Sequence, residues 1–336
     1  YLCNCKGNNL LKYHGQTFPM NIKKCLWLFF LCFLSAPSIQ AQRNYIDIPN
    51  YILCINSYAE STPWSTRMIS TISEYVQKDP QLALYAEHMN TFMIDNDSIL
   101  KEFKNMLSQK YTQPHPRLLV LLGSPAFTLR DEYRKLWGDI PIVLCSEEAF
   151  QGPHEAYLQK QAIKLKDRTP IAQFSKPYNM VFLYSELYLR ENVQLINHIK
   201  PNIKKFIFIG DKREVNLSAS LDIQNELRVK NPKIEYQFLT PQKMTTNQLL
   251  DSLYRVDPQT TGILFASWFY KTTFAGNTSL MSNDHKLIVT TPAPIFTLNM
   301  TDITEENGGM IGGYTYNQKR YSQELVRTIS DILQGK

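Results

Sequence analysis

The sequence contains two series of short apolar runs, and helical patterns separate the runs within each series. A run that is apolar on every residue is typical of a strand covered on both faces, as in a parallel sheet. Two such series predict an α/β protein with two parallel-sheet domains. The first series lies at residues 52–55, 82–89, 118–122 and 140–145, with a connecting strand at 181–184, and the second at 205–209, 234–239, 262–266 and 287–290.

The first apolar run ends in a polar and aromatic turn, Asn56-Ser57-Tyr58, and Pro63 and Trp64 follow shortly after it. Ligands of open α/β sheets sit just beyond the carboxyl ends of the strands. This turn is therefore the first place where we expect the chain to hold a small molecule. A helix should follow it, because apolar residues recur at helical spacing after Pro63: Met68, Ile69, Ile72, Tyr75 and Val76.

Residues 20–41 have the three parts of a secretion signal. Lys23 and Lys24 precede an apolar core at 25–34, and small residues lead to Ala41, after which we expect cleavage. A helix that spans a bilayer needs about 20 apolar residues, so a retained anchor is the weaker interpretation. We expect residues 1–19 to be upstream sequence unrelated to the fold, and the mature chain to be extracytoplasmic.

The charge of the chain argues against a nucleic-acid partner. The formal net charge is +6, and the four lysines of residues 1–41, which contain no acidic residue, leave +2 for the mature part. A nucleic-acid-binding protein would gather its Lys and Arg into a patch or stripe. We expect no nucleic-acid partner. Because no second apolar span follows the signal, we expect membrane attachment only through segments beyond this chain.

Of the six cysteines, Cys54 and Cys145 remain after removal of the signal. Both lie in apolar runs, where a cysteine packs as a small hydrophobic residue. In a flavodoxin-like strand order the third strand separates the first from the fourth, which leaves the two thiols too far apart for a disulfide. We expect two free thiols.

Signatures of catalysis and of metal binding are missing from the sequence. It has no G-x-S-x-G, H-E-x-x-H, C-x-x-C or G-x-G-x-x-G motif, and its histidines form no pair at i, i+4. Glu147 and Glu186 are candidates for an acid/base pair, but a ligand contact or a solvated carboxylate is the preferred interpretation for each. We expect no catalytic residue, no metal and no cofactor.

Ordered motifs spread over most of the mature chain resemble those of type I periplasmic binding domains. The best likeness is to the substrate-binding-protein-like sensor regions of bacterial histidine kinases, including hybrid two-component systems. The resemblance implies two flavodoxin-like parallel-sheet lobes, joined by a hinge, that close on a ligand. The motifs are Leu53-Cys-Ile-Asn-Ser-Tyr58 with Pro63-Trp64, residues 85–90, 118–124 and 140–145, Pro201 with residues 205–211, Thr291-Pro-Ala-Pro294, and residues 308–313 and 329–335.

This resemblance implies a division of the chain and a set of ligand contacts. The upstream segment and signal peptide would occupy residues 1–41, lobe one residues 42–178 plus 309–336, and lobe two residues 179–308. Aromatic side chains at the crevice would stack on a flat or sugar-like ligand, while Ser, Asp and Glu would fix its polar groups. Lobe one would contribute Ser57, Tyr58, Trp64, Ser124 and Glu147, and lobe two Ser185, Glu186, Asp211 and Trp268.

Structural roles stay open for several of these residues. Tyr58 and Trp64 are placed to cap a helix and pack against lobe one. Ser124 is placed as an N-cap and Asp211 as a turn or helix cap. Trp268 is equally suited to the core of lobe two or to a dimer contact, so a homodimer is left open. The run Trp268-Phe269-Tyr270 also departs from relatives that bind amino acids for transport, which have smaller or more polar residues there.

Three functions compete at this point. The first is the extracytoplasmic sensor region of a membrane histidine kinase, which binds a small molecule between two lobes. The second is a free periplasmic substrate-binding protein of an ABC importer, and the third is a secreted enzyme on an α/β scaffold, which a fold alone never excludes. We favour the first, since the chain ends directly after its last helix, at Gln334-Gly335-Lys336, as a fragment cut before a membrane span would.

Overall fold

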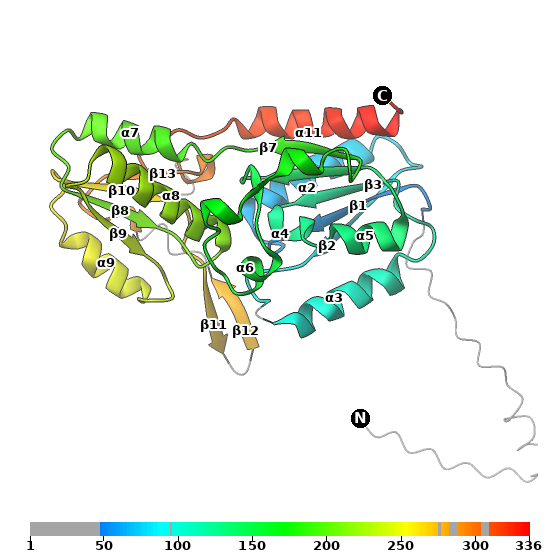
Figure 1. The fold of residues 1–336 in the computed structure, drawn as a ribbon, viewed down its shortest axis with the longest axis horizontal. Helices are drawn as coiled ribbons and strands as arrows, with labels where there is room; N and C mark the ends of the chain where they lie inside the picture. The colour runs from blue at the N-terminus through cyan, green and yellow to red at the C-terminus, as the bar shows by residue number, and fades with distance from the viewer. Residues whose placement is uncertain (1–47, 95, 275–276, 282–287, 304–308) are drawn as a thin grey trace, which may run out of the picture. The chain divides into compact units, whose positions relative to one another are not determined.

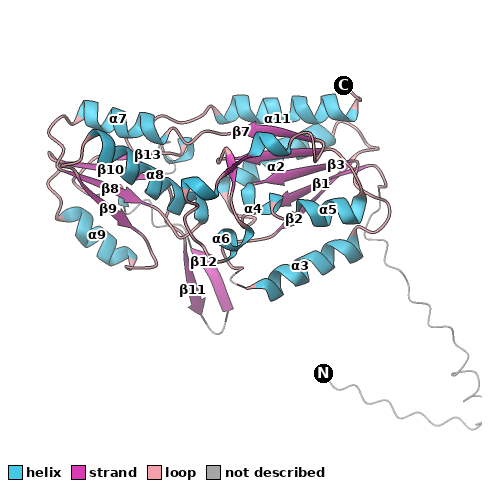
Figure 2. Cartoon of the chain, in the orientation of Figure 1, coloured by secondary structure: helices cyan, strands magenta, loops and turns pink. Residues whose placement is uncertain are grey.

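The computed structural model describes residues 48–94, 96–274, 277–281, 288–303 and 309–336 (Figure 1). The predicted signal peptide and upstream segment, residues 1–41, lie outside the described residues and stay a prediction. Strands and helices alternate along the chain (Figure 2). Among the described residues, none of the helices combines the length and apolar character that a bilayer crossing requires.

The first sheet has five parallel strands in the order β2–β1–β3–β4–β7. This is the flavodoxin-like order, in which the first strand lies inside the sheet and the chain turns to both sides of it. The predicted fold class is therefore confirmed for lobe one. The strands are β1 (Tyr51–Asn56), β2 (Ala83–His88), β3 (Leu118–Leu122), β4 (Ile142–Ser146) and β7 (Met180–Tyr184).

Helices cover both faces of the first sheet, and the alternation of side chains along each strand divides the core in two. Leu53 and Ile55 of β1 pack toward α3, α4 and α5, whereas Ile52 and Cys54 pack toward α2 and α11. The helices are α2 (Pro63–Val76), α3 (Asp97–Lys110), α4 (Ser124–Phe127), α5 (Arg130–Trp137) and α11 (Gln318–Leu333). Burial on both faces explains why the central strands β1, β3 and β4 are apolar almost throughout.

Cys54 and Cys145 are free and fully buried, as the strand order predicts. β3 lies between β1 and β4, which carry them. Burial raises the pKa of the Cys145 thiol to about 12 and that of Cys54 even further. A thiol that keeps its proton at neutral pH is a poor nucleophile, so both cysteines serve packing.

The second sheet has four parallel strands in the order β13–β10–β8–β9, again flavodoxin-like. Helices α7 and α8 pack on one face of it and α9 on the other. The strands are β8 (Lys205–Ile209), β9 (Glu235–Leu239), β10 (Thr261–Phe265) and β13 (Ile295–Thr297), and the helices are α7 (Leu189–Ile199), α8 (Glu214–Lys230) and α9 (Thr246–Tyr254).

The strand predicted at residues 287–290 is wrong where the structure describes it. Residue 287 lies outside the described part, and Thr291 closes a turn on the carbonyl of Ile288. Ile288 and Val289 are apolar because they pack in the core of lobe two, and the strand forms after Pro294, as β13. Small elements that were not predicted are β5 (Phe150–Gln151) with β6 (Thr169–Pro170), α6 (His154–Leu158), and the hairpin β11 (Tyr270–Phe274) with β12 (Asn277–Met281).

The sheet pairing differs from the predicted lobe ranges at both crossovers. β7 pairs with β4, so residues 180–184 belong to the first sheet, whereas the sequence placed everything from 179 with lobe two. Near the other crossover, Ile311 and Gly312 still hydrogen bond to β13 of the second sheet. After them the chain enters α11, which packs on α2 of lobe one. Below, lobe one means the first sheet with its helices, and lobe two the second sheet with α7, α8 and α9.

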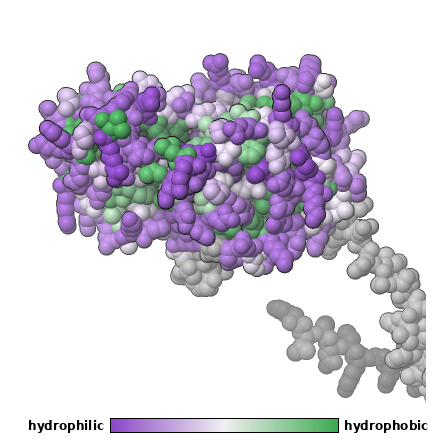
Figure 3. Space-filling view, viewed as in Figure 1, coloured by the Kyte–Doolittle hydropathy of each residue, from purple (hydrophilic) through white to green (hydrophobic). Residues whose placement is uncertain are grey.

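Hydrophilic residues dominate the face shown in Figure 3, and apolar residues form only scattered groups on it. Among large apolar side chains, the most exposed are Leu165 and Val229, which lie on different elements. Single exposed apolar side chains are normal on protein surfaces and indicate no partner.

Truncation of Leu325 should destabilise lobe one, because this side chain of α11 is fully buried against α2 and the first sheet. We expect Leu325→Ala to lower the free energy of unfolding by about 2–4 kcal/mol, measured by urea titration followed by circular dichroism. Val229→Ala, at a side chain that is 82% exposed, is the matched control and should change it by about 0.5 kcal/mol or less. Equal losses in the two variants would contradict the docking of α11.

Candidate functional site

The three predicted serines are Ser57, Ser124 and Ser185. They lie at the carboxyl ends of lobe-one strands, but they are fully or almost fully buried and form hydrogen bonds within lobe one. Ser57 donates to the carbonyl of Gly123 and accepts from the backbone N–H of Ala126, which caps the short helix α4. Ser124 and Ser146 share a hydrogen bond of 2.7 Å between their hydroxyls. These contacts give the serines a structural role.

Ser185 was predicted as a lobe-two residue, and this placement is wrong. It follows β7, and both its backbone N–H and its hydroxyl donate to the carbonyl of Ser146 at the end of β4. The reason is the pairing of β7 with β4, which carries residue 185 to the edge of the first sheet. Glu186, the next residue, was assigned to lobe two by the same reasoning and likewise follows β7.

Tyr58 and Trp64 form an aromatic pair at the end of β1. Their rings meet edge to face, with centroids 5.7 Å apart. Gly123 has a φ of +91°, and a Cβ there would lie 2.9 Å from both the Ser57 and the Tyr58 hydroxyl oxygens. A glycine at residue 123 thus lets β3 end close against the turn that carries Tyr58.

Arg213 of lobe two faces this aromatic pair. Its guanidinium carbon lies 5.8 Å from the centroid of Tyr58 and 4.8 Å from that of Phe269, within the range of cation–π contacts. Asp211, fully buried, pairs with Arg213 at 2.9 Å and also accepts from the Ser267 hydroxyl at 2.7 Å. Predicted Asp211 therefore positions Arg213, which in turn meets lobe one.

Carboxyl groups gather around this contact. Burial raises the pKa of Glu147. The guanidinium of Arg213 partly offsets this rise, and the carboxylate of Asp211 adds to it. Glu148 follows β4 of lobe one and Glu214 begins α8 of lobe two, and their side chains are only 6% and 4% exposed. Burial raises the pKa of Glu214 to about 7. Burial, and next the carboxyl of Glu214, raise the pKa of Glu148 well above its usual range.

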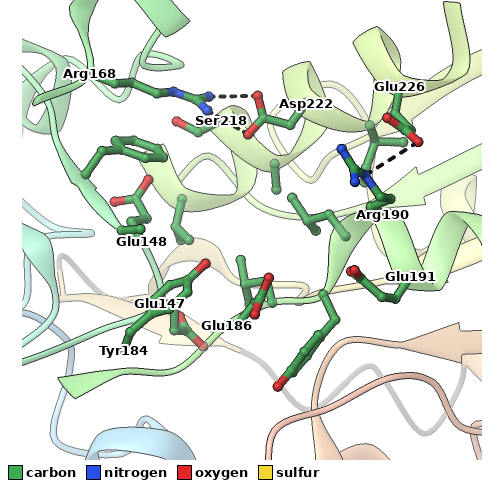
Figure 4. A pocket seen from close by; sticks show the side chains of 18 residues that line it. Glu147, Glu148, Arg168, Tyr184, Glu186, Arg190, Glu191, Ser218, Asp222 and Glu226 are labelled. Carbon is green, nitrogen blue, oxygen red and sulfur yellow. Dashed lines mark hydrogen bonds and ion pairs between the residues drawn. The ribbon is translucent and has the colours of Figure 1, made fainter. Parts of the chain in front are cut away.

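A cavity of about 420 Å³ opens beside these carboxyls, within the range of small-molecule sites. Lobe one lines it with the segment after β4 and the end of β7, and lobe two lines it with α7 and α8. Figure 4 shows Glu147, Glu148 and Glu186 on one side of it and the pairs Arg168–Asp222 and Arg190–Glu226 on another. Predicted Glu147 and Glu186 thus meet at this cavity, where Glu186 is exposed.

Two contacts join the lobes beside the cavity. Arg168, in the irregular segment after β4, makes a bidentate pair with Asp222 of α8, with N–O distances of 2.8 and 2.9 Å. The backbone N–H of Ile163 donates to the hydroxyl of Ser218, also on α8, at 3.0 Å. We call these the latch. It ties a loop of lobe one to a helix of lobe two directly at the wall of the cavity.

Trp268 lies in the core of lobe two. It is 2% exposed, packs with β8, β10 and α9, and donates its indole N–H to Thr246 at 3.1 Å. Trp268 borders a second, more open cavity of about 720 Å³, which only lobe-two residues line. Of the two structural roles left open for Trp268, packing in the core of lobe two is the one observed. Trp268 does not line the cavity of about 420 Å³ between the lobes, which we call the crevice cavity.

Several residues of the site were missed from the sequence, namely Glu148, Arg168, Arg213, Glu214 and Asp222. Glu148, Arg213 and Glu214 stand within three residues of predicted Glu147 and Asp211, at the same strand ends. The rule that found Asp211 could have found them if it had been extended into the next turn. Arg168 lies in a stretch with no regular pattern, and no signal in the sequence marks it.

Charged side chains and aromatic rings line much of the site. No group of three or more His, Cys, Asp or Glu in the described part of the chain is arranged to hold a metal. The cavity lining contains no His, Cys or Lys that could serve beside the carboxylates as a nucleophile or base. What the arrangement can do is enclose a small molecule between two lobes.

The comparison with known proteins identifies the fold. No protein-family model matches the sequence, and no curated protein does. Solved structures that resemble this chain include the following three. A conserved domain protein from Vibrio cholerae matches over 86% of each chain, with 13% identity and a TM-score of 0.52. A LacI transcriptional regulator from Lactobacillus brevis matches over 85% of this chain and 94% of its own, with 7% identity and a TM-score of 0.51.

The third is a periplasmic binding protein/LacI transcriptional regulator from Alkaliphilus metalliredigens, solved with D-xylulofuranose. It matches over 85% of this chain and 91% of its own, with 13% identity and a TM-score of 0.49. Identities this low concern the fold alone. Together with the two flavodoxin-like sheets, the likenesses to the Vibrio cholerae and Lactobacillus brevis structures show that this chain has the two-lobe α/β fold of type I periplasmic binding proteins and LacI-type regulators.

Proposed function

We propose that this chain is the extracytoplasmic ligand-binding sensor region of a membrane histidine kinase, which holds a small molecule between its lobes and signals by lobe closure. The observation that carries the proposal is the crevice cavity, which residues of both lobes line and the latch borders. A ligand there contacts both lobes only when they are closed. It therefore favours the closed form by its differential affinity.

The packing of α2 and α11 offers a route from the cavity to the end of the described chain. α2 begins at Pro63, five residues after Tyr58, which meets Arg213 of lobe two. Met68 and Ile72 of α2 share a core with Leu325 and Ile329 of α11. A change in how Tyr58 meets lobe two would thus move the helix on which α11 rests, and α11 is the element that would lead toward a membrane span.

The kinase context is tested by the reading frame beyond Lys336. We expect an apolar span followed by kinase motifs. A stop codon at that point would overturn the sensor proposal and favour the free substrate-binding protein of an importer. Ligand binding itself is tested by a thermal-shift screen of small molecules, since a ligand at a hundred times its dissociation constant adds about 2.7 kcal/mol of stability.

Asp222→Asn should open the lobes, because it removes the carboxylate that Arg168 grips in the latch. A hydrogen-bonded charge pair of this kind is worth about 1–3 kcal/mol, so the population of the closed form should fall. We expect a larger radius of gyration by small-angle X-ray scattering. Asp139→Asn, which breaks the exposed pair Arg134–Asp139 within lobe one, is the matched control. Identical scattering from the two variants would show that the latch does not hold the lobes.

Glu214→Gln should flatten the dependence of stability on pH. The folded protein holds the Glu214 proton up to about pH 7, whereas the unfolded chain releases it near pH 4.5. The stability from this proton is therefore full below about pH 4.5 and is lost as pH rises to 7 and above. Between pH 5 and 8 we expect the wild type to lose on the order of 1–3 kcal/mol more than Glu214→Gln, measured by urea titration.

The matched control for this prediction is Glu155→Gln, at an exposed residue of α6. It should keep the full pH dependence of the wild type. The groups that interact with Glu214 are Arg213, Lys160 and Asp211, with Glu148 across the lobe interface. Parallel pH profiles for the wild type and Glu214→Gln would contradict the buried position of this carboxyl.

A further inference from the structure

We propose that the crevice cavity takes an organic cation, a ligand whose ammonium or guanidinium group sits against Glu148. This inference rests on the proposed function and names the ligand class of the same site. It begins with charge. Six carboxylates and two guanidinium groups line the cavity, a net charge of −4 when all are ionised. A cleft lined by one sign of charge attracts the opposite sign.

Both cationic side chains of the lining are already paired. Arg168 is held by Asp222 in the latch, and Arg190 lies 3.9 Å from Glu226, which also pairs with Lys230. The carboxylates left over are Glu147, Glu148, Glu186 and Glu191. Arg213 interacts with Glu147, and Arg168, which Asp222 already holds, interacts with Glu148. The cavity thus has an excess of acceptors that a cationic donor would satisfy.

Glu148 gives the second, independent observation. Its side chain is only 6% exposed, and its Oε1 has no hydrogen-bond partner in the described structure. A buried polar atom without a partner is costly, so a donor supplied by a ligand would stabilise it. Because Glu148 lines the cavity, a cation held there is placed to supply that donor.

Aromatic rings complete the environment for a cation. Tyr184 and Tyr188 line the same cavity, and the Tyr184 ring lies among Glu147, Glu148 and Glu186 in Figure 4. Tyr188 has a φ of +50°, a left-handed conformation that is rare for a bulky residue and that is found most often at functional sites. Carboxylates beside exposed ring faces favour ammonium and guanidinium groups.

The spread of the carboxylates favours an organic cation over a metal ion. No three of the described acidic residues, histidines or cysteines are close enough to form a metal site. A cavity of about 420 Å³ also far exceeds the volume of one ion. A linear amine, with its charge against Glu148 and its chain along the aromatic rings, fits both observations.

The test uses four probes of similar length, each titrated into the intact chain by calorimetry at pH 7.5. They are 1,5-diaminopentane, 5-amino-1-pentanol, 1,5-pentanediol and agmatine. We expect the diamine and agmatine to bind most tightly, the amino alcohol more weakly and the uncharged diol not at all. Glu148→Gln should weaken binding of the amines by about tenfold or more, because it removes a charge-assisted hydrogen bond. Glu155→Gln, off the cavity, should leave it unchanged.

The melting temperature of the free variant separates ligand contact from a purely structural role, because it should rise while the affinity for the amines falls. Glu148→Gln removes a buried carboxylate that faces Glu214, so the free variant should melt at a higher temperature than the wild type. The same variant should bind the amines less well. Affinity of the wild type for the amines should also rise as the pH increases, because burial raises the pKa of Glu214 to about 7 and also raises the pKa values of Glu148 and Glu147, which lie near Arg168, Arg213 and Tyr157.

Each possible result either supports the inference of a cation or overturns it. Equal affinity of the wild type and Glu148→Gln for an amine would overturn the position of the cation. If no amine binds but a neutral or anionic compound from the thermal-shift screen does, the inference of a cation fails while the proposed binding function stands. If neither the amines nor any screened compound binds, both fail.

Discussion

Beside the latch, the two lobes meet at one largely buried guanidinium, that of Arg213, whose side chain is 14% exposed. Asp211 and Ser267 hold it from inside lobe two, and the Tyr58 ring meets it from lobe one. A buried cation persists only when it is paired, so the fully buried carboxylate of Asp211 decides where Arg213 can point. Asp211 follows β8 and Tyr58 follows β1. Both partners therefore reach the crevice because side chains beyond the carboxyl ends of parallel strands share one edge of the sheet.

The central strands of lobe one, β1, β3 and β4, could be predicted because burial on both faces makes them apolar almost throughout, and the order of the runs indicated the fold class. The membership of β7 could not be predicted in this way. It is an edge strand with Val181 and Tyr184 exposed, so its composition does not distinguish the two sheets. Ile288 and Val289 misled the same rule, since apolar residues in a packed turn resemble those of a short strand. Arg168 was beyond reach, because a loop that crosses between lobes leaves no periodic pattern.

The predicted site residues divide by side-chain length. Ser57, Ser124 and Ser185 have short hydroxyls, and they satisfy groups close to the strand ends, where the sheet ladder no longer supplies partners. Glu147, Glu186 and Asp211 extend further and reach the cavity or the lobe contact. The rule based on strand ends therefore located the correct edge of each sheet. It did not separate residues that hydrogen bond to nearby backbone groups from residues that reach the cavity or the lobe contact.

Two opposing terms meet at the cavity. Under the proposed mechanism of lobe closure, the latch and Arg213 would favour closure, whereas Glu148 of lobe one and Glu214 of lobe two would oppose it, since closure would bury both carboxyls against each other. This repulsion exists mainly in the closed form, because opening separates the lobes that carry the two groups. A ligand that neutralises it would stabilise the closed form and leave the open form almost unchanged. That difference is what a two-state receptor requires, since a ligand with equal affinity for both forms shifts nothing. Under the proposed function, burying like charges at the interface would cost stability in the empty protein and would make closure depend on what fills the cavity.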